Sequence, residues 1–461
     1  MKRWTVILSA LWFWNAASST MAAPRPNILF IVSDDQGWND IGYHNAEMRT
    51  PNLDRLAKGG VELDCHYVQP QCSPTRVALL TGCYPSRFGL DCCRATNEPT
   101  FPLGTATIAS LLKDAGYATG MSGKWHVGPN ADWGPNRFGF DYSHGSYSGA
   151  VGMYDHRYVP GHPLEITWHR DREIIPGYEN GTHATDLTAG EAVKWIENHV
   201  EIGEPWFFYV PFHAPHLPLV EQDEKWHEMN KHISSPDRHL YAAAVSHMDS
   251  AVGRMIEALE RTNQLQRTIV IFTSDNGAQE DWRGGNYPPP NPHVRNFSSN
   301  KPLRGAKSTA YEGGCRVPAF VNWAGTLAAR KIVAPLHVVD WAPTLAGLAG
   351  CESRHDLQWD GIDLWPILTG EKAAPVERSI YIVWGFKREW EALRYGDWKI
   401  VRRKGRPWEL YDLSADPNET KNLADAHSDK RKELIERYEQ VRSRDAVPDT
   451  TEKEPSAISK Q

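Results

Sequence analysis

The sequence predicts an α/β fold in which a large mixed, mostly parallel sheet is flanked by helices, with a smaller C-terminal antiparallel sheet plus one helix. Three short apolar runs, each followed by polar residues, are typical of buried parallel strands; they span 27–33, 206–210 and 268–273. Apolar residues recur at helical spacing over 243–259 and predict a helix with one buried face. Strands that alternate with helices indicate a mostly parallel sheet.

The pattern changes near residue 373. Residues 379–384 and 398–402 look like strands with no long helix between them, and 409–413 precedes a turn. A charged helix is expected over 429–442, and the polar residues after it are typical of a disordered tail. We therefore divide the chain into an N-terminal signal segment, a main domain, an antiparallel subdomain and a tail: 1–23, 24–372, 373–447 and 448–461.

The N-terminus is typical of an export signal. Lys2 and Arg3 precede a short apolar stretch, and small residues near Ala22 and Ala23 offer cleavage sites. The stretch is too short for a confident membrane span, and no later segment is long and apolar enough. We expect a secreted or periplasmic protein without stable membrane insertion; the alternative is a retained anchor.

Composition narrows the function classes. Hydrophobic residues make up 41% of the 461 residues and charged residues 23%, as in globular proteins. The net charge of −7 argues against a broad basic surface, so we expect no nucleic-acid partner. The chain has seven cysteines, and an odd count in an exported protein leaves one without a partner. If Cys72 is that residue, the other six could form disulfides in several ways.

Polar side chains follow two of the predicted strands. Asp34 and Asp35 come after the first strand, and Asp275 and Asn276 come after the strand at 268–273. In folds of this type ligands bind beyond the carboxyl ends of the strands. Carboxylate and amide oxygens suit Ca²⁺ or Mg²⁺. The alternative for each pair is an ordinary turn or helix cap.

Cys72 follows a loop and precedes a predicted helix, with Pro74 in the first turn. A helix N-terminus lowers the pKa of a thiol, so the position allows a reactive thiolate. A buried or disulfide-bonded cysteine is the alternative.

Three further segments carry cations and imidazoles. Lys124 and His126 alternate about a tryptophan, so both would face one side of an extended segment. Prolines flank His216, with His213 nearby as a rival, and Lys307 ends a short Pro- and Gly-containing segment. Together they suit proton transfer and binding at an oxyanion, although each alone could be structural or solvated.

Taken in chain order, these motifs resemble the sulfatase family of the alkaline-phosphatase-like superfamily. The first family motif matches Cys72-Ser73-Pro74-Thr75-Arg76, and the second matches 116–126. Other blocks match in the same order: Asp34-Asp35, Pro215-His216-Leu217-Pro218, Ser274-Asp275-Asn276-Gly277, Leu303-Arg304-Gly305-Ala306-Lys307 and 410–423. The resemblance covers nearly the whole chain after the signal segment. Within the family it is most similar to arylsulfatases of the N-acetylgalactosamine-4-sulfatase type.

The resemblance implies that Cys72 is oxidised to formylglycine by a formylglycine-generating enzyme. The aldehyde hydrates to a geminal diol, one hydroxyl of which is the nucleophile, activated by Arg76 and a cation. The family's cation is Ca²⁺, one per chain, with Mg²⁺ as the alternative. Its implied ligands are Asp34, Asp35, Asp275, Asn276 and residue 72 as formylglycine.

The resemblance also assigns roles to the remaining side chains. Lys124 and Lys307 would hold the sulfate oxygens, and His216 would bind the ester and protonate the leaving oxygen. His126 would be the base that releases the sulfate.

The predicted function is hydrolysis of sulfate esters, in a sulfated carbohydrate or an aryl sulfate, with 24–372 as the catalytic domain. One alternative is a phosphoester or phosphonate hydrolase of the same superfamily, and another is a catalytically silent homologue that binds sulfated glycans. The segment 284–299 reads as a long loop beside the site. It carries no motif, so the natural substrate is not predicted.

Overall fold

The structure is a computed structural model. It describes residues 25–446 apart from five short gaps: 202, 285–286, 289–292, 352–356 and 386. The predicted signal segment 1–23 and tail 448–461 lie outside the described residues. Of the helices in the described part, none has the length and apolar character needed to cross a membrane.

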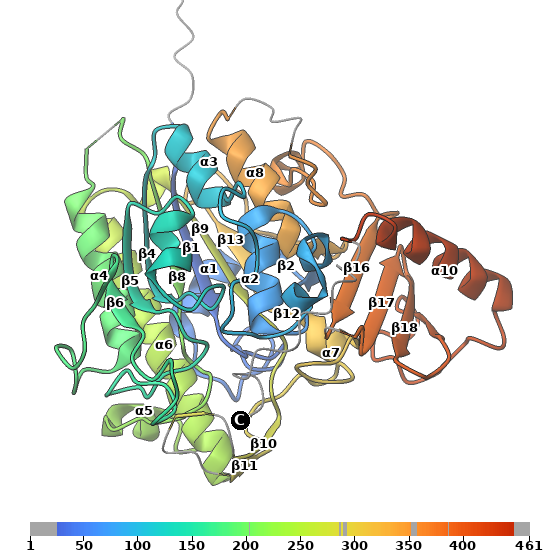
Figure 1. Cartoon of the computed structure of the whole chain (residues 1–461), viewed down its shortest axis with the longest axis horizontal. Coiled ribbons are helices and arrows are strands. Elements are labelled where there is room, and N and C mark those ends of the chain that lie inside the picture. Colours follow the sequence, from blue (N-terminus) through green and yellow to red (C-terminus); the bar gives the residue numbers. More distant parts are fainter. Residues whose placement is uncertain are drawn as a thin grey trace, which may run out of the picture.

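One mixed sheet runs through the middle of the molecule (Figure 1). Its central strands β9, β1, β8, β4 and β5 are parallel, and antiparallel strands flank them on both sides. Across the sheet, the strands within the described residues are β14 (Arg330–Ile332), β2 (Val61–Leu63), β13 (Ala319–Asn322), β9 (Thr268–Ser274), β1 (Asn27–Ser33), β8 (Trp206–Pro211), β4 (Ala118–Lys124), β5 (Tyr142–Ser146), β6 (Trp168–Arg170) and β7 (Glu173–Ile174). This sheet, with its three predicted apolar strands, confirms the expected fold class.

Helices bury both faces of the sheet. Every residue of β1 is buried, because Leu29 and Ile31 point into one apolar core and Ile28 and Phe30 into the other. The Leu29 face is covered by α1 (Pro51–Lys58), α4 (Ala184–Asn198) and α6 (Pro236–Arg261). The Ile28 face is covered by α2 (Cys72–Thr81), α3 (Ile108–Asp114) and α8 (Trp341–Leu348). The helix predicted over 243–259 is the inner part of α6, which continues at both ends.

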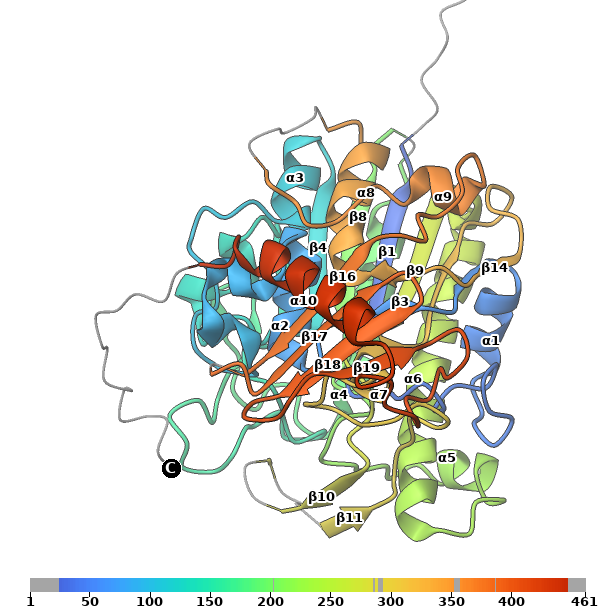
Figure 2. The same cartoon turned by 90° about the vertical axis from the view of Figure 1, so that its right-hand side faces the viewer.

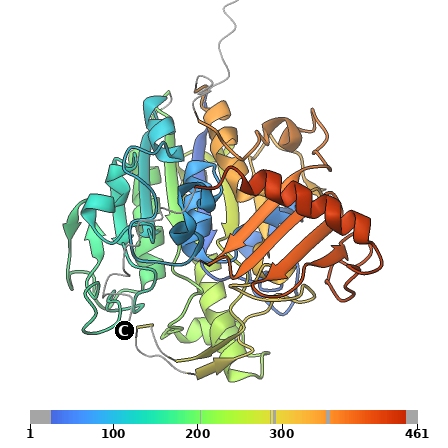
Figure 3. The ribbon, with the colours of Figure 1, turned by 45° about the vertical axis from the view of Figure 1, so that its right-hand side comes forward.

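The C-terminal part is a separate antiparallel sheet crossed by one helix (Figure 3). Its elements are β16 (Ser379–Trp384), β17 (Trp390–Tyr395), β18 (Trp398–Arg403), β19 (Glu409–Asp412) and α10 (Ser428–Arg442). One face packs Leu393 and Ile400 against Leu434 and Tyr438 of α10. The sequence did not predict β17. Its Glu391 and Arg394 are buried, and charged residues at buried positions hide a strand pattern.

The sequence predicted a loop over 284–299, but part of this segment forms a strand. β11 (His293–Arg295) pairs antiparallel with β10 (Asp281–Arg283), and β11 contacts α6; Figure 2 shows the ribbon at the lower end of the molecule, where α5 (Glu224–Met229) also lies. Val294 is buried in an apolar cluster with Phe297, which stabilises the strand among residues rich in Gly, Pro and Asn.

The remaining elements are short. The strands β3 (His66–Tyr67), β12 (Arg316–Val317) and β15 (Leu336–His337) form a small sheet, and α7 (Glu312–Cys315) and α9 (Trp365–Thr369) are single-turn helices. Short 3₁₀ helices span Pro85–Phe88, Leu90–Cys93, Ala131–Trp133, Pro135–Arg137, Leu265–Arg267 and Val338–Asp340.

None of the seven cysteines, all of which the structure describes, is in a disulfide. The thiols of Cys92 and Cys315 instead donate to backbone carbonyls of Thr100 and Tyr311. The sequence had left six cysteines available for pairing.

Candidate active site

The carboxyl ends of β1 and β9 bring the predicted oxygen ligands together. The two strands are parallel neighbours in register up to Ser33 and Ser274, so the residues that follow them meet at one edge. The backbone N–H of Asp35 donates to Asp275 Oδ1 at 3.1 Å, and Asn276 Nδ2 donates to Asp35 Oδ1 at 2.7 Å.

Two oxygens of this group have no hydrogen-bond partner. Asp34 Oδ1 and Asn276 Oδ1 are buried acceptors without a donor. Buried polar atoms are normally satisfied, so these orphaned oxygens point to a ligand that they would hold. Burial, followed by the nearby Asp275, raises the pKa of Asp34 well above its usual range. A hard divalent cation would bind the two unpartnered oxygens, because it prefers carboxylate and amide oxygens, and its charge would favour the ionised form of Asp34.

Asp35 is the most strongly paired of the acids. Its backbone adopts a φ of 63°, in the left-handed region, and its Oδ2 accepts from Lys307 Nζ at 2.7 Å. His216 Nε2 lies 3.6 Å from the same oxygen. Burial opposes ionisation, but Lys307 and then His216 outweigh it and lower the pKa of Asp35 to about 2. The carboxylate is therefore ionised.

Cys72 is the first residue of α2, as predicted, and its side chain is 2% exposed. Burial raises the pKa of the thiol above its ordinary value, although Lys124 and Lys307 lower it. The unmodified side chain is therefore a neutral thiol, and desolvation outweighs the helix N-terminus that had allowed a reactive thiolate.

Arg76 ties α2 to two strand ends. Its guanidinium donates to the carbonyl of Lys124 and to Asp275 Oδ2, both at 2.8 Å. Because Arg76 is fully buried, these bonds fix the helix that begins at Cys72 against the ends of β4 and β9.

Lys124 and His126 do not share one extended segment, contrary to the sequence prediction. β4 ends at Lys124, whose Nζ donates to Asp34 Oδ2 at 2.7 Å, and His126 has a φ of 56°. His126 Nδ1 is buried without a partner. Burial, and then Lys124, lowers the pKa of His126 well below its ordinary value, so the imidazole is neutral.

His216 sits between two cis prolines. Its Nδ1 lies 2.6 Å from the carbonyl of Leu217, which fixes the proton on Nδ1 and leaves Nε2 toward Asp35. Burial lowers the pKa of His216 to about 3. The rival His213 is also buried, with both ring nitrogens unpartnered, and its ring is tilted against Trp168 at 5.9 Å.

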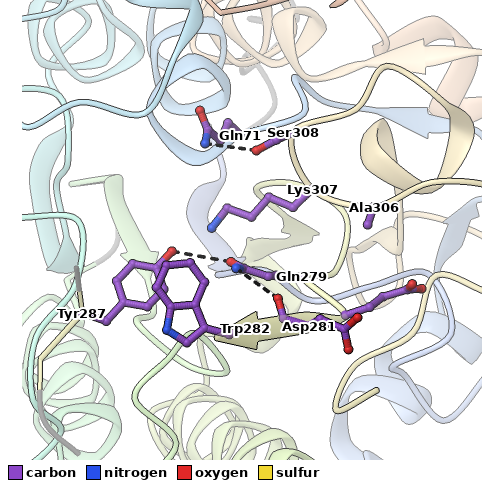
Figure 4. A pocket seen from close by; sticks show the side chains of 9 residues that line it. Gln71, Gln279, Asp281, Trp282, Tyr287, Ala306, Lys307 and Ser308 are labelled. Atoms are coloured by element: carbon purple, nitrogen blue, oxygen red, sulfur yellow. Dashed lines mark hydrogen bonds between the residues drawn. The ribbon is translucent and has the colours of Figure 1, made fainter. Parts of the chain in front are cut away.

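A cavity of about 140 Å³ brings Cys72 together with His126, His216 and Lys307. A larger cavity of about 390 Å³ adjoins it and shares Lys307 (Figure 4). Gln71 and Tyr287 also line both cavities, and the sequence analysis did not identify them. It also missed three residues that line the smaller cavity: Asn97, Gly149 and Tyr158. None lies in a recognisable motif; only the fold brings them to the site.

The sheet and the oxygen-lined site at its edge define a hydrolase of the alkaline-phosphatase-like fold. Residues 26–351 match the family described as Sulfatase, and residues 306–444 match the one described as N-sulphoglucosamine sulphohydrolase, C-terminal. The chain belongs to the sulfatase family and is a sulfuric ester hydrolase, as the resemblance predicted.

Individual relatives agree with this assignment. Arylsulfatase J of Mus musculus is 31% identical, covering 94% of this chain and 78% of its own length. N-acetylgalactosamine-6-sulfatase of Sus scrofa is 32% identical, covering 86% of this chain and 78% of its own. The 4-sulfatase type expected from the sequence stays a prediction.

Among solved structures, that of Ps i-CgsB in complex with k-i-k-neocarrahexaose aligns with a TM-score of 0.82 and 29% identity, covering 92% of this chain and 94% of that one. The phosphonate monoester hydrolase of Agrobacterium radiobacter, at 20% identity and a TM-score of 0.62, shares the fold.

Proposed function

We propose that the chain is a formylglycine-dependent sulfatase that acts on a sulfated carbohydrate with one bound divalent cation. The observation that carries the proposal is the meeting of Cys72, two histidines and Lys307 in one cavity, beside the orphaned oxygens of Asp34 and Asn276. A complete set of nucleophile, proton carriers and anion binders argues against a silent glycan-binding homologue.

The cation would be held by Asp34, Asp35, Asp275, Asn276 and residue 72, and we propose Ca²⁺, with Mg²⁺ as the alternative. When bound, it supplies positive charge that lowers the pKa of a neighbouring hydroxyl and neutralises sulfate oxygens. A formylglycine hydrate at residue 72 supplies two hydroxyls, one to attack sulfur and one to expel the sulfate.

The chain's own cations orient the ester. Lys124 and Lys307 lie at hydrogen-bond distance from Asp34 and Asp35, so their ammonium groups are fixed at the edge where the sulfate oxygens would lie. Arg76 holds the start of α2 through Asp275 and the end of β4, which keeps residue 72 in line with the ester.

The two histidines carry protons. His126 is neutral and has a free Nδ1, so it can accept the proton whose loss from residue 72 releases the sulfate. His216 presents Nε2 to the site and would protonate the leaving oxygen. Its pKa of about 3 makes it neutral at rest, so this role requires the anionic ester to raise that pKa on binding.

A carbohydrate substrate is supported by the relatives named N-acetylgalactosamine-6-sulfatase and by the structure solved with k-i-k-neocarrahexaose. Oxidation of Cys72 would require a formylglycine-generating enzyme as a partner during maturation. We further propose that the protein is secreted or periplasmic, on the basis of the N-terminal sequence pattern.

Matched esters test the proposal. Protein produced with a formylglycine-generating enzyme should cleave 4-nitrophenyl sulfate and sulfated oligosaccharides, and 4-nitrophenyl phosphate at least about tenfold more slowly. The control is Cys72→Ala, which should bind but not turn over the sulfate. Preferential hydrolysis of the phosphate would contradict the proposal and favour the phosphoester alternative.

A further inference from the structure

An aromatic pair forms one wall of the larger cavity (Figure 4). The rings of Trp282, from β10, and Tyr287 stack with centroids 4.4 Å apart and planes 26° apart. Tyr287 also contacts His216 edge to face, with ring centroids 4.6 Å apart. The pair therefore begins at the proposed proton donor and extends outward, along the path that the leaving group of an ester would take.

Amide and hydroxyl groups lie on both sides of this cavity. Gln279 accepts from the Tyr287 hydroxyl at 3.5 Å, and Gln71 donates to Ser308 at 3.2 Å on the opposite side (Figure 4). Aromatic faces combined with a few amide and hydroxyl groups suit a sugar ring, which offers a C–H face and a rim of hydroxyls.

The outer cavity has a net negative lining. Glu280 and Asp281 both contribute to it, and Lys307 is the sole lysine or arginine among its described lining residues. The ammonium of Lys307 is already paired with Asp35 at 2.7 Å. Two cations outside the lining act on these carboxylates. Burial raises the pKa of Glu280, although Lys301 lowers it. Arg295 stands opposite Asp281 in the ribbon. Neither cation is a described lining residue of the cavity. A second negative charge on the ring that carries the ester would therefore meet two carboxylates at the cavity surface and only the paired Lys307 as a cation.

We propose that the sugar ring bearing the ester stacks on Trp282, and that Glu280 and Asp281 select an uncharged ring over a uronic acid. This inference rests on the proposed sulfatase function and adds to it the substrate class and three specificity residues.

The charge selection is tested with two substrates that differ at one carbon. A methyl galactoside and a methyl galacturonoside, sulfated at the same ring carbon, differ only by a hydroxymethyl group against a carboxylate. We expect the neutral ester to have a kcat/KM roughly tenfold higher at low salt, the size of one unscreened charge contact. In E280Q/D281N the preference should fall below about threefold, whereas the control Asp425→Asn, a fully exposed acid before α10, should keep it.

The stacking is tested separately. Trp282→Ala should raise KM for the neutral sugar ester about tenfold with a smaller change in kcat, and Trp282→Phe should recover most of it. Thermal unfolding of each variant checks that the fold is intact.

Turnover of 4-nitrophenyl sulfate distinguishes failure of this inference from failure of the proposed sulfatase function. If the wild type cleaves that ester but treats the two sugars alike, or if E280Q/D281N leaves the preference unchanged, the charge selection is wrong. An unchanged KM in Trp282→Ala would overturn the stacking. If 4-nitrophenyl sulfate and both sugar esters are not cleaved, the proposed function fails and this inference fails with it.

Discussion

At the scale of single residues, the site depends on a glycine that sequence reasoning did not single out. A Cβ at Gly149 would lie 2.3 Å from His126 Nε2, well inside van der Waals contact. Gly149 also donates its N–H to Asn97 at 2.9 Å, so its backbone is held against the cavity that contains Cys72. The ring of His126 keeps its place because position 149 has no side chain.

Gly149→Ala should therefore displace His126 and lower kcat at least about tenfold, as part of the roughly 10²- to 10⁴-fold that a positioned base contributes. The φ of Gly149 lies outside the left-handed region, so the free energy of unfolding should fall by less than about 2 kcal/mol. Steady-state kinetics and denaturant unfolding measure the two effects. Gly190→Ala is the control, since a Cβ there meets open space; wild-type kcat in Gly149→Ala would refute the role given to His126.

The motifs predicted most of the residues that meet at the site, because each lies where a strand ends or a helix begins. The sequence predicted that Asp34 and Asp275 follow the carboxyl ends of two strands, and the parallel neighbours β1 and β9 bring them together. The prediction that Lys124 and His126 face one side of an extended segment was wrong, because the backbone turns at His126. Lining residues such as Tyr287 follow from tertiary packing, which no local signal encodes.

At the scale of elements, a buried imidazole joins α6 and α4 to the segment that carries His216. His247 Nδ1 lies 2.8 Å from Glu221 Oε2, and its Nε2 lies 3.2 Å from Asp186 Oδ1. Burial opposes protonation of His247, but the hydrogen bonds to Asp186 and Glu221 outweigh it and raise its pKa to about 9.

This pairing predicts a pH-dependent stability. The folded pKa of His247 lies above the unfolded value of about 6.5, so the stabilisation is complete below pH 6.5 and is lost as pH rises through about 9. The loss is at most about 3 kcal/mol, and His247→Gln should remove this part of the pH dependence. Urea unfolding between pH 6.5 and 9.5 measures it, with the exposed His232→Gln as control. Equal slopes in wild type and His247→Gln would contradict the assignment.

Elements with a clear apolar period were predicted well, and those stabilised by long-range pairing were not. β1, β8 and β9 are uninterrupted apolar runs, so burial on both faces follows from their residues. β11 exists because Val294 reaches an apolar cluster from α6 and neighbouring segments, and β17 carries buried charges that pair in space. These apolar and charged partners are distant in sequence, so local patterns do not predict them.

At the scale of the whole molecule, the C-terminal sheet is joined to the active-site loop by buried charges. Lys399 of β18 lies 2.8 Å from Glu312 Oε1 and 3.0 Å from Glu419 Oε1, and all three side chains are fully buried. Glu312 opens α7, shortly after Lys307, and Arg304 of the same loop donates to the carbonyl of Glu419 at 3.0 Å. The subdomain thus holds the segment that presents Lys307.

Lys399→Met should lower the free energy of unfolding by about 3–5 kcal/mol, because it leaves the buried Glu419 without its cation and Glu312 with only more distant arginines, of which Arg316 is 3.8 Å away. Replacing all three residues, in K399M/E312Q/E419Q, should recover much of that loss. Chemical denaturation measures both, and Lys331→Met, which removes a half-exposed pair with Glu62, should change the free energy by less than about 1 kcal/mol. A Lys399→Met protein as stable as wild type would show that the triad does not hold the loop.

A bound cation should stabilise the whole fold, because the orphaned oxygens of Asp34 and Asn276 exist as a site only in the folded chain. Calcium at about one hundred times its dissociation constant should add about 2.7 kcal/mol. Thermal unfolding with chelator and then with added Ca²⁺ or Mg²⁺ measures the gain. Asp275→Asn should sharply reduce the stabilisation by the cation. An equal stabilisation in that variant would show that the cation binds elsewhere.

The central claim is that residue 72 acts as an aldehyde hydrate, and the most direct test compares modification with activity. Mass spectrometry of the peptide containing residue 72 gives the aldehyde fraction, since exchange of a thiol for an aldehyde makes the peptide lighter and thiol oxidation makes it heavier. Across preparations made with different amounts of formylglycine-generating enzyme, sulfatase activity should rise in proportion to that fraction and extrapolate to zero. Full activity in protein with an intact Cys72 thiol would contradict the account.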